Sequence, residues 1–385
     1  MGYTFNGLNG KSKDDFGHGS AKYITYMNVY KNPIATLEEL DLIEIDKSQN
    51  EIKKGDILFT TSSETPEEVG LSSVWMYEIT NIYLNSFCFG FRLEQKISIN
   101  YMAYMLRSNS IRNKITLLAQ GISRYNISKK GMMNIEVFLP SYAEQTQIGN
   151  FFKQLDDTIA LHQRELEKFK ILKTSYLEHI FLGKVSLFTA KNTITWEQRK
   201  LGEVVERITR KNLNLESRLP LTISAQDGLI SQTEFFDKQV ASKNISGYYL
   251  IENGEFAYNK SYSNGYPWGA IKRLDKYKNG VLSTLYIVFK PIDVDSQFLV
   301  SYFDTTFWHS EIAEIAVEGA RNHGLLNIPV MDFFRIKIKI PKSKEEQTQI
   351  GNFFKQLDDT IALHQKELAK YQQIKTACLE KMFME

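Results

Sequence analysis

One stretch around residue 260 interleaves aromatic, amide and cationic side chains. Its candidate binding residues are Tyr258, Asn259, Lys260, Tyr262, Asn264 and Trp268. An asparagine can hydrogen-bond to base edges, a lysine can contact phosphates, and a tyrosine or tryptophan can pack on sugars or bases. The same composition also occurs in ordinary surface loops. Nucleic-acid binding and a plain solvated loop are therefore both open interpretations of this stretch.

Two arginines recur at matching places in the chain, each shortly after a glycine. The residues of these two segments that we consider as nucleic-acid contacts are Arg124, Tyr125, Arg321, Asn322 and His323. Arginine can bind guanine or phosphate, and it can equally brace a domain against a neighbouring helix. The weaker candidates are polar residues of the N-terminal stretch and two threonines, namely Lys11, Lys13, Lys22, Tyr26, Asn28, Thr61 and Thr222.

The sequence offers no recognisable catalytic or metal-binding motif. It has no Walker phosphate loop, no G-x-G-x-x-G after a strand, and no H-E-x-x-H. No proline is followed by a second proline or by aspartate, so the adenine-methylating and proline–aspartate nuclease signatures are missing. Cys88 and Cys378 lie far apart and match no metal-ligand spacing. We expect a protein that binds rather than catalyses, with no catalytic residue, no metal and no cofactor of its own.

Length and composition point to an ordinary globular protein. The 385 residues suit two or three domains. A net charge of +2 neither requires nor excludes nucleic acid, because averaging over the chain hides a local basic face. No charged-then-apolar leader opens the chain, and no stretch approaches the ~18 apolar residues of a membrane span. The expected location is the cytoplasm, with no membrane partner.

An internal repeat is the strongest signal in the sequence. The segment EQTQIGNFFKQLDDTIALHQ begins at Glu144 and recurs without a change from Glu346. Weaker similarity continues beyond it, for example Lys173 with Lys375. Chance cannot produce this, and the period is far too long for a solenoid, so the chain is a domain-scale duplication.

Both copies of the repeat are predicted to be one long helix. They contain no proline, and they are rich in good helix formers. Apolar residues recur at alternating steps of four and three, which is a heptad seam typical of a helix that pairs with another helix. The seam residues are Ile148, Phe152, Leu155, Ile159 and Leu166 in the first copy, and Ile350, Phe354, Leu357, Ile361 and Leu368 in the second. A helix of ~38 residues spans ~57 Å, so its natural partner is the other copy, parallel or antiparallel.

Polar residues of the helices have structural interpretations. His162 and His364 lie on the seam, where they are expected to set the register or to hydrogen-bond across the pair. Adjacent aspartates at 156–157 and 358–359 diverge by about 100° on a helix, so they do not share a site. We expect them on a solvated or partner-facing edge.

The remaining sequence forms two related but diverged domains. The predicted organisation is a first domain at 1–143, a helix at 144–182, a linker at 183–194, a second domain at 195–345 and a helix at 346–385. Residues 54–59 match residues 253–258, and both read as a turn entering a strand. Near its end each domain has an apolar strand that closes on proline, predicted at 135–140 and 334–341. Short strands mixed with a few helices indicate the α+β class.

This arrangement resembles the specificity (S) subunit of type I restriction-modification systems. The resemblance rests on the E-Q-x-x-I-x-x-F-F-x-x-L-D-x-x-I blocks at 144–159 and 346–361, on the glycine–arginine segments before them, and on W-E-Q-R-K-L-G-E at 196–203. It covers essentially the whole chain. Family members usually carry a similar opening before the first domain. This sequence starts at Met1 already inside the domain pattern, so we expect a first domain without that opening.

The resemblance implies both a fold and a function. Each target recognition domain would read one half of a split site in double-stranded DNA. The two helices would pack as an antiparallel coiled coil with pseudo-two-fold symmetry and act as a spacer. Two modification subunits would dock on the helices and use S-adenosylmethionine, and restriction subunits would add ATP- and Mg-dependent translocation and cleavage.

Two other classes stay open on the residues alone. A coiled-coil scaffold with protein-binding domains would leave no DNA footprint with any partner. A stand-alone enzyme such as a self-contained methyltransferase would transfer methyl groups as the purified chain, and the missing motifs argue against it.

Overall fold

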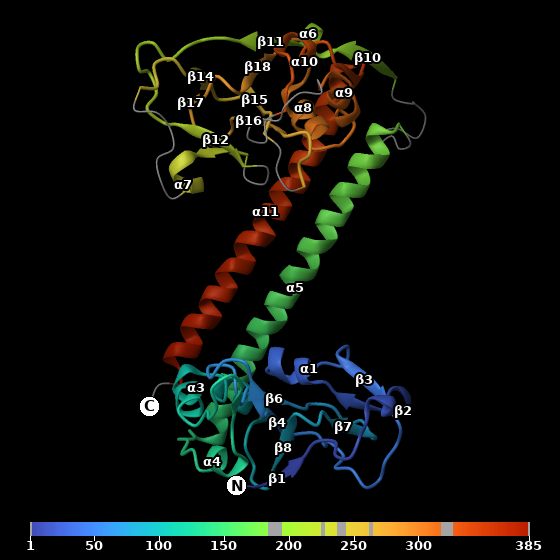
Figure 1. Ribbon diagram of the computed structural model, residues 1–385, viewed down its shortest axis with the longest axis vertical. Coiled ribbons are helices and arrows are strands. Elements are labelled where there is room, and N and C mark those ends of the chain that lie inside the picture. The colour runs from blue at the N-terminus through green and yellow to red at the C-terminus, as the bar shows by residue number, and fades with distance from the viewer. Residues whose placement is uncertain are drawn as a thin grey trace. The chain divides into compact units, whose positions relative to one another are not determined.

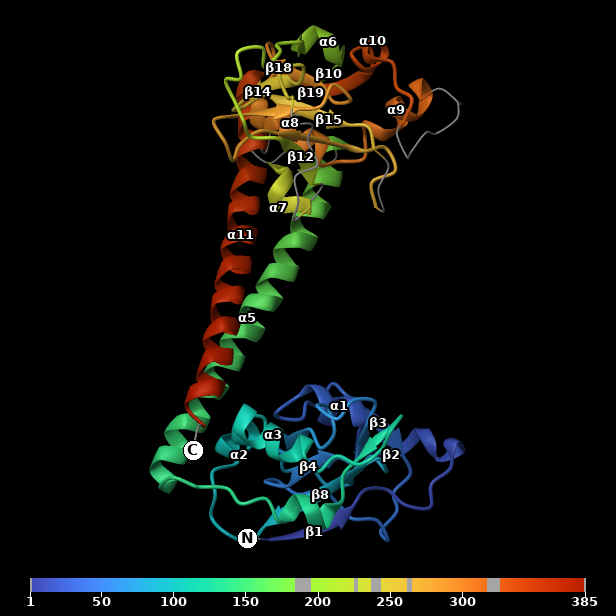
Figure 2. The ribbon, with the colours of Figure 1, turned by 60° about the vertical axis from the view of Figure 1, so that its left-hand side comes forward.

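The computed structural model describes residues 2–183, 195–224, 228–236, 244–261, 265–316 and 326–383 (Figure 1). It divides into two compact units: unit 1 contains Met1–Glu165 and His364–Glu385, and unit 2 contains Leu166–Leu363. Each unit thus holds one globular domain with a segment of each long helix, α5 (Tyr142–Phe181) and α11 (Lys344–Lys381). Figure 2 shows both as uninterrupted helices.

Helices and strands are mixed in both units, which confirms the predicted α+β class. The elements of unit 1 before α5 are β1 (Gly2–Asn6), a 3-10 helix at Lys13–Asp15, β2 (Phe16–Ile24), α1 (Tyr26–Lys31), β3 (Leu40–Ile43), β4 (Ile57–Thr60), β5 (Ser62–Ser63), β6 (Ser72–Val74), β7 (Ile82–Leu84), β8 (Cys88–Leu93), α2 (Ile99–Met105), α3 (Asn109–Thr116), β9 (Tyr125–Asn126) and α4 (Lys129–Met133).

The elements of unit 2 between the two long helices are β10 (Trp196–Lys200), α6 (Leu201–Val204), β11 (Val205–Ile208), β12 (Leu221–Ser224), β13 (Gly228–Ser231), α7 (Gln232–Phe236), β14 (Tyr249–Glu252), β15 (Phe256–Asn259), β16 (Ala270–Arg273), β17 (Asn279–Leu282), β18 (Ile287–Pro291), α8 (Ser296–Phe303), α9 (His309–Ile315), α10 (Val330–Phe333) and β19 (Lys337–Pro341).

The central sheets of the two units have the same topology. Among the described residues the strand order is β1-β8-β4-β6 in unit 1 and β11-β18-β15-β16 in unit 2, and all neighbours are antiparallel. The registers also agree, since Ile57 pairs with Phe91 in unit 1 and Phe256 pairs with Phe289 in unit 2. These four side chains therefore occupy equivalent places in their sheets.

The predicted match between residues 54–59 and 253–258 is confirmed. Each segment is a turn that enters a central strand, β4 in unit 1 and β15 in unit 2. The turn glycines Gly55 and Gly254 have φ values of 93° and 86°. Only glycine adopts this left-handed conformation at no steric cost, which explains the glycine at both turns.

The long helices attach to their domains through an equivalent buried glutamine. Gln145 Oε1 accepts a hydrogen bond of 3.0 Å from the backbone N–H at the N-cap of α2, and its Nε2 donates at 2.9 Å to the carbonyl of Pro140. Gln347 makes the same pair of bonds, both at 2.8 Å, to the N-cap of α8 and to Pro341. Each glutamine thereby holds a helix start, a neighbouring helix and the preceding segment together.

The predicted seam residues of α5 and α11 turn their side chains away from solvent. All are buried or half-buried, including Ile148, Phe152, Leu155, Ile159, Leu166, Ile350, Phe354, Leu357, Ile361 and Leu368. Apolar residues off the seam are exposed instead: Leu161 by 50%, Ile171 by 62% and Leu363 by 57%. The heptad pattern thus separates the covered from the open side of each helix.

The strand predicted at residues 135–140 is wrong, whereas its equivalent in unit 2 is β19. The two segments differ because only the one in unit 2 has a partner strand among the described residues. β19 pairs along its length with β10, but no strand of the described part of unit 1 pairs with residues 135–140. A pattern of apolar residues makes a strand only where another backbone satisfies its N–H and C=O groups.

Candidate nucleic-acid interface

In unit 1, β5 pairs with β9, and four sequence-predicted residues lie at or beside this pairing: Tyr26, Thr61, Arg124 and Tyr125. We call this pairing the unit 1 junction. The carbonyl of Thr61 accepts a hydrogen bond of 3.0 Å from the N–H of Ile127, and the Thr61 hydroxyl donates to the carbonyl of Phe87 at 2.8 Å. Thr61 thus holds the loop that carries Arg124 against the end of β4.

The side chains around the unit 1 junction combine aromatic and cationic groups. The Tyr26 hydroxyl donates to the carbonyl of Ser62 at 2.7 Å, and burial raises the pKa of Tyr26. Tyr125 in β9 is half-buried, and Arg124 beside it is exposed. The structure therefore brings an exposed guanidinium and the rims of two tyrosines to one place, a set of groups suited to phosphate and base contacts.

Unit 2 has an equivalent junction. The N–H of Leu326 donates to the carbonyl of Lys260 at 2.9 Å, just as Ile127 bonds to Thr61 in unit 1. Burial lowers the pKa of Lys260, because a desolvated ammonium is disfavoured, and no carboxylate of the described residues forms an ion pair with it.

The predicted contacts Tyr262, Asn264, Arg321, Asn322 and His323 lie outside the described residues. Asn259 and Trp268 are half-buried and flank the unit 2 junction. The Asn259 side chain accepts a hydrogen bond of 3.0 Å from the backbone N–H of Ser261 and so shapes the turn after β15. The indole of Trp268 packs on the core of unit 2.

Three predicted contacts are buried, which corrects the expectation that they touch DNA directly. Asn28 has no exposed surface, and its amide nitrogen donates to the carbonyls of residues 36 and 39. Tyr258 is also fully buried, and it stacks on Phe333 at a ring distance of 5.0 Å. Thr222 is 6% exposed, with its hydroxyl 3.3 Å from that of Tyr286. All three residues hold their domains together.

The N-terminal lysines differ in whether their ammonium groups are exposed or held in an ion pair within unit 1. Lys11 forms an ion pair of 2.8 Å with Asp46, whose carboxylate raises the pKa of Lys11. That lysine braces two loops of unit 1. Lys13 in the 3-10 helix and Lys22 in β2 are exposed. They remain candidates for phosphate contacts.

Sequence reasoning missed two arginines that shape the surroundings of the unit 1 junction. Arg112 donates to three carbonyls of residues 67–70 at 2.6 to 2.9 Å, and Arg107 donates to the carbonyls of residues 29–32. Burial lowers the pKa of both to about 10, so both stay charged at neutral pH. Their partners are backbone groups, and no residue pattern reveals such a contact.

Within each unit the long helices contact one another through aromatic rings and an ion pair. In unit 1, Phe152 stacks on Phe383 at 5.5 Å, and Lys375 pairs with Asp156. In unit 2 the equivalent pair is Lys173 with Asp358, at 2.7 Å. The aspartates at 156 and 358 therefore face a partner helix, as the sequence suggested.

The other polar predictions for the helices can also be located. Asp157 bonds instead to Lys153 of its own helix, at 2.6 Å. In unit 1 the Nδ1 atoms of His162 and His364 lie 3.0 Å apart, which joins the two helices at this level of the seam. No cluster of His, Cys, Asp or Glu able to hold a metal occurs in the described part of the chain. None of the described helices is long and apolar enough to cross a membrane.

Comparison with known proteins adds to this geometry. The chain matches the type I restriction modification DNA specificity domain twice, at residues 11–170 and 193–373. It is 27% identical to the StySPI type I restriction enzyme specificity subunit of Salmonella potsdam over 165 residues, which is 41% of this chain and 35% of that protein. The match thus spans little more than a third of that relative's length.

A solved structure shows the same fold. All of the chain aligns with 94% of the S subunit of the type I restriction-modification system from M. genitalium, with a TM-score of 0.61 and 18% identity. An HsdS subunit from Thermoanaerobacter tengcongensis aligns over 94% of this chain and 90% of its own, with a TM-score of 0.46 and 15% identity. Because the DNA specificity domain matches most of the sequence in two copies, this chain belongs to the family of type I restriction-modification DNA specificity proteins.

Proposed function

We propose that this chain is the non-catalytic recognition subunit of a type I restriction-modification complex, and that each domain reads one half of a bipartite site in double-stranded DNA. One observation carries the proposal: the two units share a sheet topology and a junction, yet differ in the junction residues. Thr61 in unit 1 corresponds to Lys260 in unit 2. A common frame with different side chains suits two domains that read different bases.

The long helices are proposed to be the spacer between the half-sites. Early residues of α5 meet late residues of α11, as with Asp156 and Lys375, and late residues of α5 meet early residues of α11, as with Lys173 and Asp358. This pattern supports an antiparallel coiled coil with pseudo-two-fold symmetry. Its length would fix the gap between the two halves of the DNA site.

Modification subunits are the proposed partners of the outer helix faces. Leu161 and Leu363 are equivalent residues of the repeat, and both are exposed. The same polar face recurs around them, for instance in the pairs Lys153–Asp157 and Lys355–Asp359. Two identical surfaces in one chain suit two copies of one partner. Those partners would bring S-adenosylmethionine, and restriction subunits would bring ATP and Mg; this chain would bind no cofactor itself.

Exchange of residues 1–143 for the first domain of another family member tests whether each domain reads one half-site. Methylation mapping in cells that also express a modification subunit should show one changed half-site and one unchanged half-site. The matched exchange of residues 195–345 should change only the other half. If either exchange altered both halves, the modular assignment would fail. A chain that gives no DNA footprint with any modification subunit would support the protein-binding scaffold instead.

Insertion of one heptad at equivalent places in both helices tests the spacer. Seven residues lengthen a helix by about 10 Å, which is about three base pairs of B-form DNA. The methylated site should keep both half-sequences and gain a longer gap. An unchanged gap with normal methylation would refute the spacer role while leaving the assignment of half-sites intact.

A further inference from the structure

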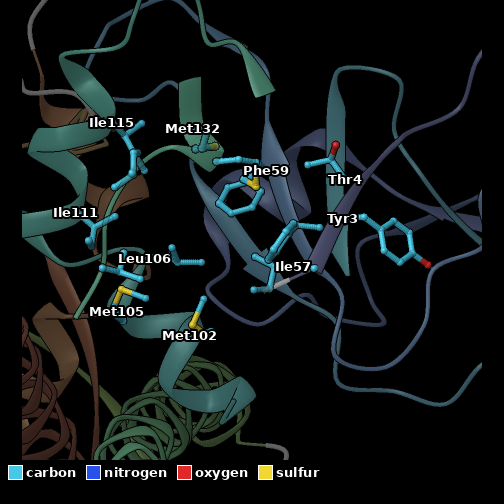
Figure 3. Close-up of a pocket in the computed structure, with 15 residues that line it drawn as sticks. Tyr3, Thr4, Ile57, Phe59, Met102, Met105, Leu106, Ile111, Ile115 and Met132 are labelled. Atoms are coloured by element: carbon cyan, nitrogen blue, oxygen red, sulfur yellow. The ribbon is translucent and has the colours of Figure 1, made fainter. Parts of the chain in front are cut away.

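Helices α2 and α3 of unit 1 contribute to two cavities of different chemistry. The first is an open apolar groove of about 530 Å³ beside the central sheet (Figure 3). Figure 3 shows Ile57 and Phe59 of β4 on one side of this groove and Met102 of α2 on the other. In unit 2, α6 fills the equivalent place, because Leu201 is fully buried in the core that contains Phe256, the equivalent of Ile57. The groove thus belongs to the packing of the core.

The second cavity of unit 1 has a volume of about 460 Å³ and is lined by several charged side chains. It lies where α2 and α3 meet the end of α11, and every residue that lines it belongs to unit 1. We call it the cationic pocket, after the basic and hydrogen-bonding side chains in its lining: Lys31, Arg107, Arg112, Asn113, Thr116 and Lys375. Cationic side chains from α1, α2, α3 and α11 therefore converge on one cavity.

The two arginines of the cationic pocket carry charge that no carboxylate neutralises directly. In the described part of unit 1, the hydrogen bonds of Arg107 and Arg112 all end on backbone carbonyls. Burial lowers the pKa of each guanidinium to about 10, and the charge of Arg112 further lowers that of Arg107. Both stay protonated at neutral pH, so two like charges are held close enough to repel each other.

Asp156 of α5 is the half-buried carboxylate that faces these cations. It pairs with Lys375, and it accepts a hydrogen bond of 2.9 Å from the Tyr104 hydroxyl. Its charge also acts on Arg107, but it does not outweigh the effect of burial on the pKa of that guanidinium. Three half-buried cations, namely Arg107, Arg112 and Lys375, thus face one half-buried carboxylate.

The mouth of the cationic pocket adds neutral hydrogen-bond donors. Asn113 is exposed and Thr116 is half-buried, and both belong to α3. An amide and a hydroxyl can each donate to an oxyanion. Lys31 lies 3.7 Å from Glu39, and Glu67 is exposed to solvent, so the charges at the mouth are offset or screened.

The equivalent place in unit 2 has different residues. Counted from the N-caps of α2 and α8, Asp304 is equivalent to Arg107, and His309 is equivalent to Arg112. Burial lowers the pKa of His309, so this imidazole is uncharged at neutral pH. Unit 2 therefore has a carboxylate and a neutral ring where unit 1 has two guanidiniums.

The charges at this place in unit 2 balance one another. Asp304 pairs with Lys173 at 2.9 Å and with Lys272 at 2.8 Å, and Lys173 also pairs with Asp358 at 2.7 Å. Two cations thus meet two carboxylates in unit 2, whereas three cations meet one in unit 1. The surplus of two positive charges in unit 1 equals the charge that a phosphate monoester carries near neutral pH, about −1.5 to −2.

We propose that the cationic pocket of unit 1 binds a small organic phosphate. The phosphate group would lie among Arg112, Lys375 and the donors of α3, where charge-assisted hydrogen bonds are strong. The organic part would lie against the apolar lining of Pro33, Leu71 and Leu379. Bound phosphate would join α3 to α11 and so stabilise unit 1. Such a site would act whether or not the domain reads DNA.

The test is calorimetric titration of the full chain with glycerol 3-phosphate. Glycerol and potassium chloride at matched ionic strength are the controls. We expect one saturable site per chain for glycerol 3-phosphate and none for either control. Inorganic phosphate should bind the same site more weakly, because it has no organic part to contact the apolar lining. If glycerol 3-phosphate showed no saturable binding, the proposal would be wrong.

Asn113→Asp tests whether the cationic pocket is the site. It adds a carboxylate to the lining with little change of shape, at an exposed position. The new charge should repel phosphate and weaken the binding of glycerol 3-phosphate by roughly tenfold or more. Gln163→Glu makes the same change of net charge at an exposed position of α5, and it should bind like the native chain.

Two outcomes of this variant would overturn the proposal. One is equal binding of glycerol 3-phosphate by the native chain and Asn113→Asp. The other is an Asn113→Asp chain that loses affinity for a DNA duplex while its affinity for glycerol 3-phosphate stays unchanged. The cationic pocket would then contact DNA rather than hold a small ligand.

Hydrogen exchange in the native chain covers the case in which the variant fails to fold. With glycerol 3-phosphate at ten times its Kd, the amides of residues 113–116 in α3 should exchange up to about tenfold more slowly. The equivalent residues 310–313 of α9 are the internal control, and their exchange should stay unchanged. Equal slowing in α3 and α9, or slowing in neither, would contradict a site in unit 1.

Discussion

Units 1 and 2 share a sheet order, a capped helix against that sheet and a glutamine that attaches the long helix. They differ in how the frame is completed. In unit 2, α6 and β10 fill the groove and pair with β19, and Leu201 is fully buried. In unit 1 the groove is open, and residues 135–140 pair with no strand among the residues that the structure describes. The shared sheet order, capped helix and glutamine attachment thus specify the fold. The segment of β10 and α6 determines how completely the apolar core is buried.

The largest effect expected from a single change is the loss of a seam phenylalanine. Phe152 and Phe354 are equivalent and buried, so alanine at either position should cost about 3–5 kcal/mol of unfolding free energy. Phe354 should lie at the upper end, because it belongs to the closed core of unit 2. Urea unfolding followed by hydrogen exchange in each unit would measure both costs. If either variant reduced the hydrogen-exchange protection of both units equally, the two units would not have separate cores.

A smaller and less symmetric effect is expected at the two inter-helix lysines. Lys173 lies between Asp358 and Asp304, at 2.7 and 2.9 Å, whereas Lys375 pairs with Asp156. Lys173→Ala would leave Asp358 without its ion-pair partner and Asp304 with Lys272 alone, and it should cost roughly 3 kcal/mol. Lys375→Ala should cost roughly 1–2 kcal/mol, because the Tyr104 hydroxyl still donates to Asp156 at 2.9 Å. Chemical denaturation of both variants checks the order, and a costlier Lys375→Ala would reverse it.

Much of this comparison was predictable from the sequence, and the reasons for the failures are specific. The identical repeat and its heptad seam predicted the long helices, because helical periodicity is local and strong. The glycine turns at 55 and 254 predicted the central strands, because a turn that enters a strand is also a local signal. The strand at 135–140 failed because pairing depends on a segment distant in the chain.

Some candidate nucleic-acid contacts were predicted wrongly because local sequence does not reveal burial or long-range pairing. Asn28 and Tyr258 have the residue types of nucleic-acid contacts, but both are fully buried. Residue type does not reveal burial. The meeting of Thr61 with the segment of Arg124 depends on a backbone pairing between distant strands, and no local pattern encodes it.

The two buried glutamines provide the next test of the shared frame. Gln145→Leu and Gln347→Leu each remove two hydrogen bonds and leave a backbone N–H and a carbonyl without these partners. Each variant should lose about 2 kcal/mol. Since the bonding is equivalent, the two losses should agree closely, as measured by thermal and urea unfolding. Gln163→Leu, at an exposed position of α5, is the control and should be near neutral. A large difference between the two variants would show that the helix starts are not equivalent.

The smallest expected effect is the acid dependence that Asp304 gives to unit 2. Asp304 occupies the place of Arg107 in unit 1. Burial by itself would raise the pKa of Asp304, but Lys272 and Lys173 outweigh it and hold the pKa below its ordinary value of 3.8. A carboxylate with a lowered pKa stabilises the fold above 3.8 and loses that contribution as the pH falls through the folded pKa. The stability advantage of the native chain over Asp304→Asn should therefore be constant from about pH 7 to 5 and shrink below pH 3.8. Urea unfolding at a series of pH values measures it, with exposed Asp157→Asn as the control that shows little advantage at neutral pH. An advantage that grew toward acid would mean that burial, rather than the two lysines, controls the charge of Asp304.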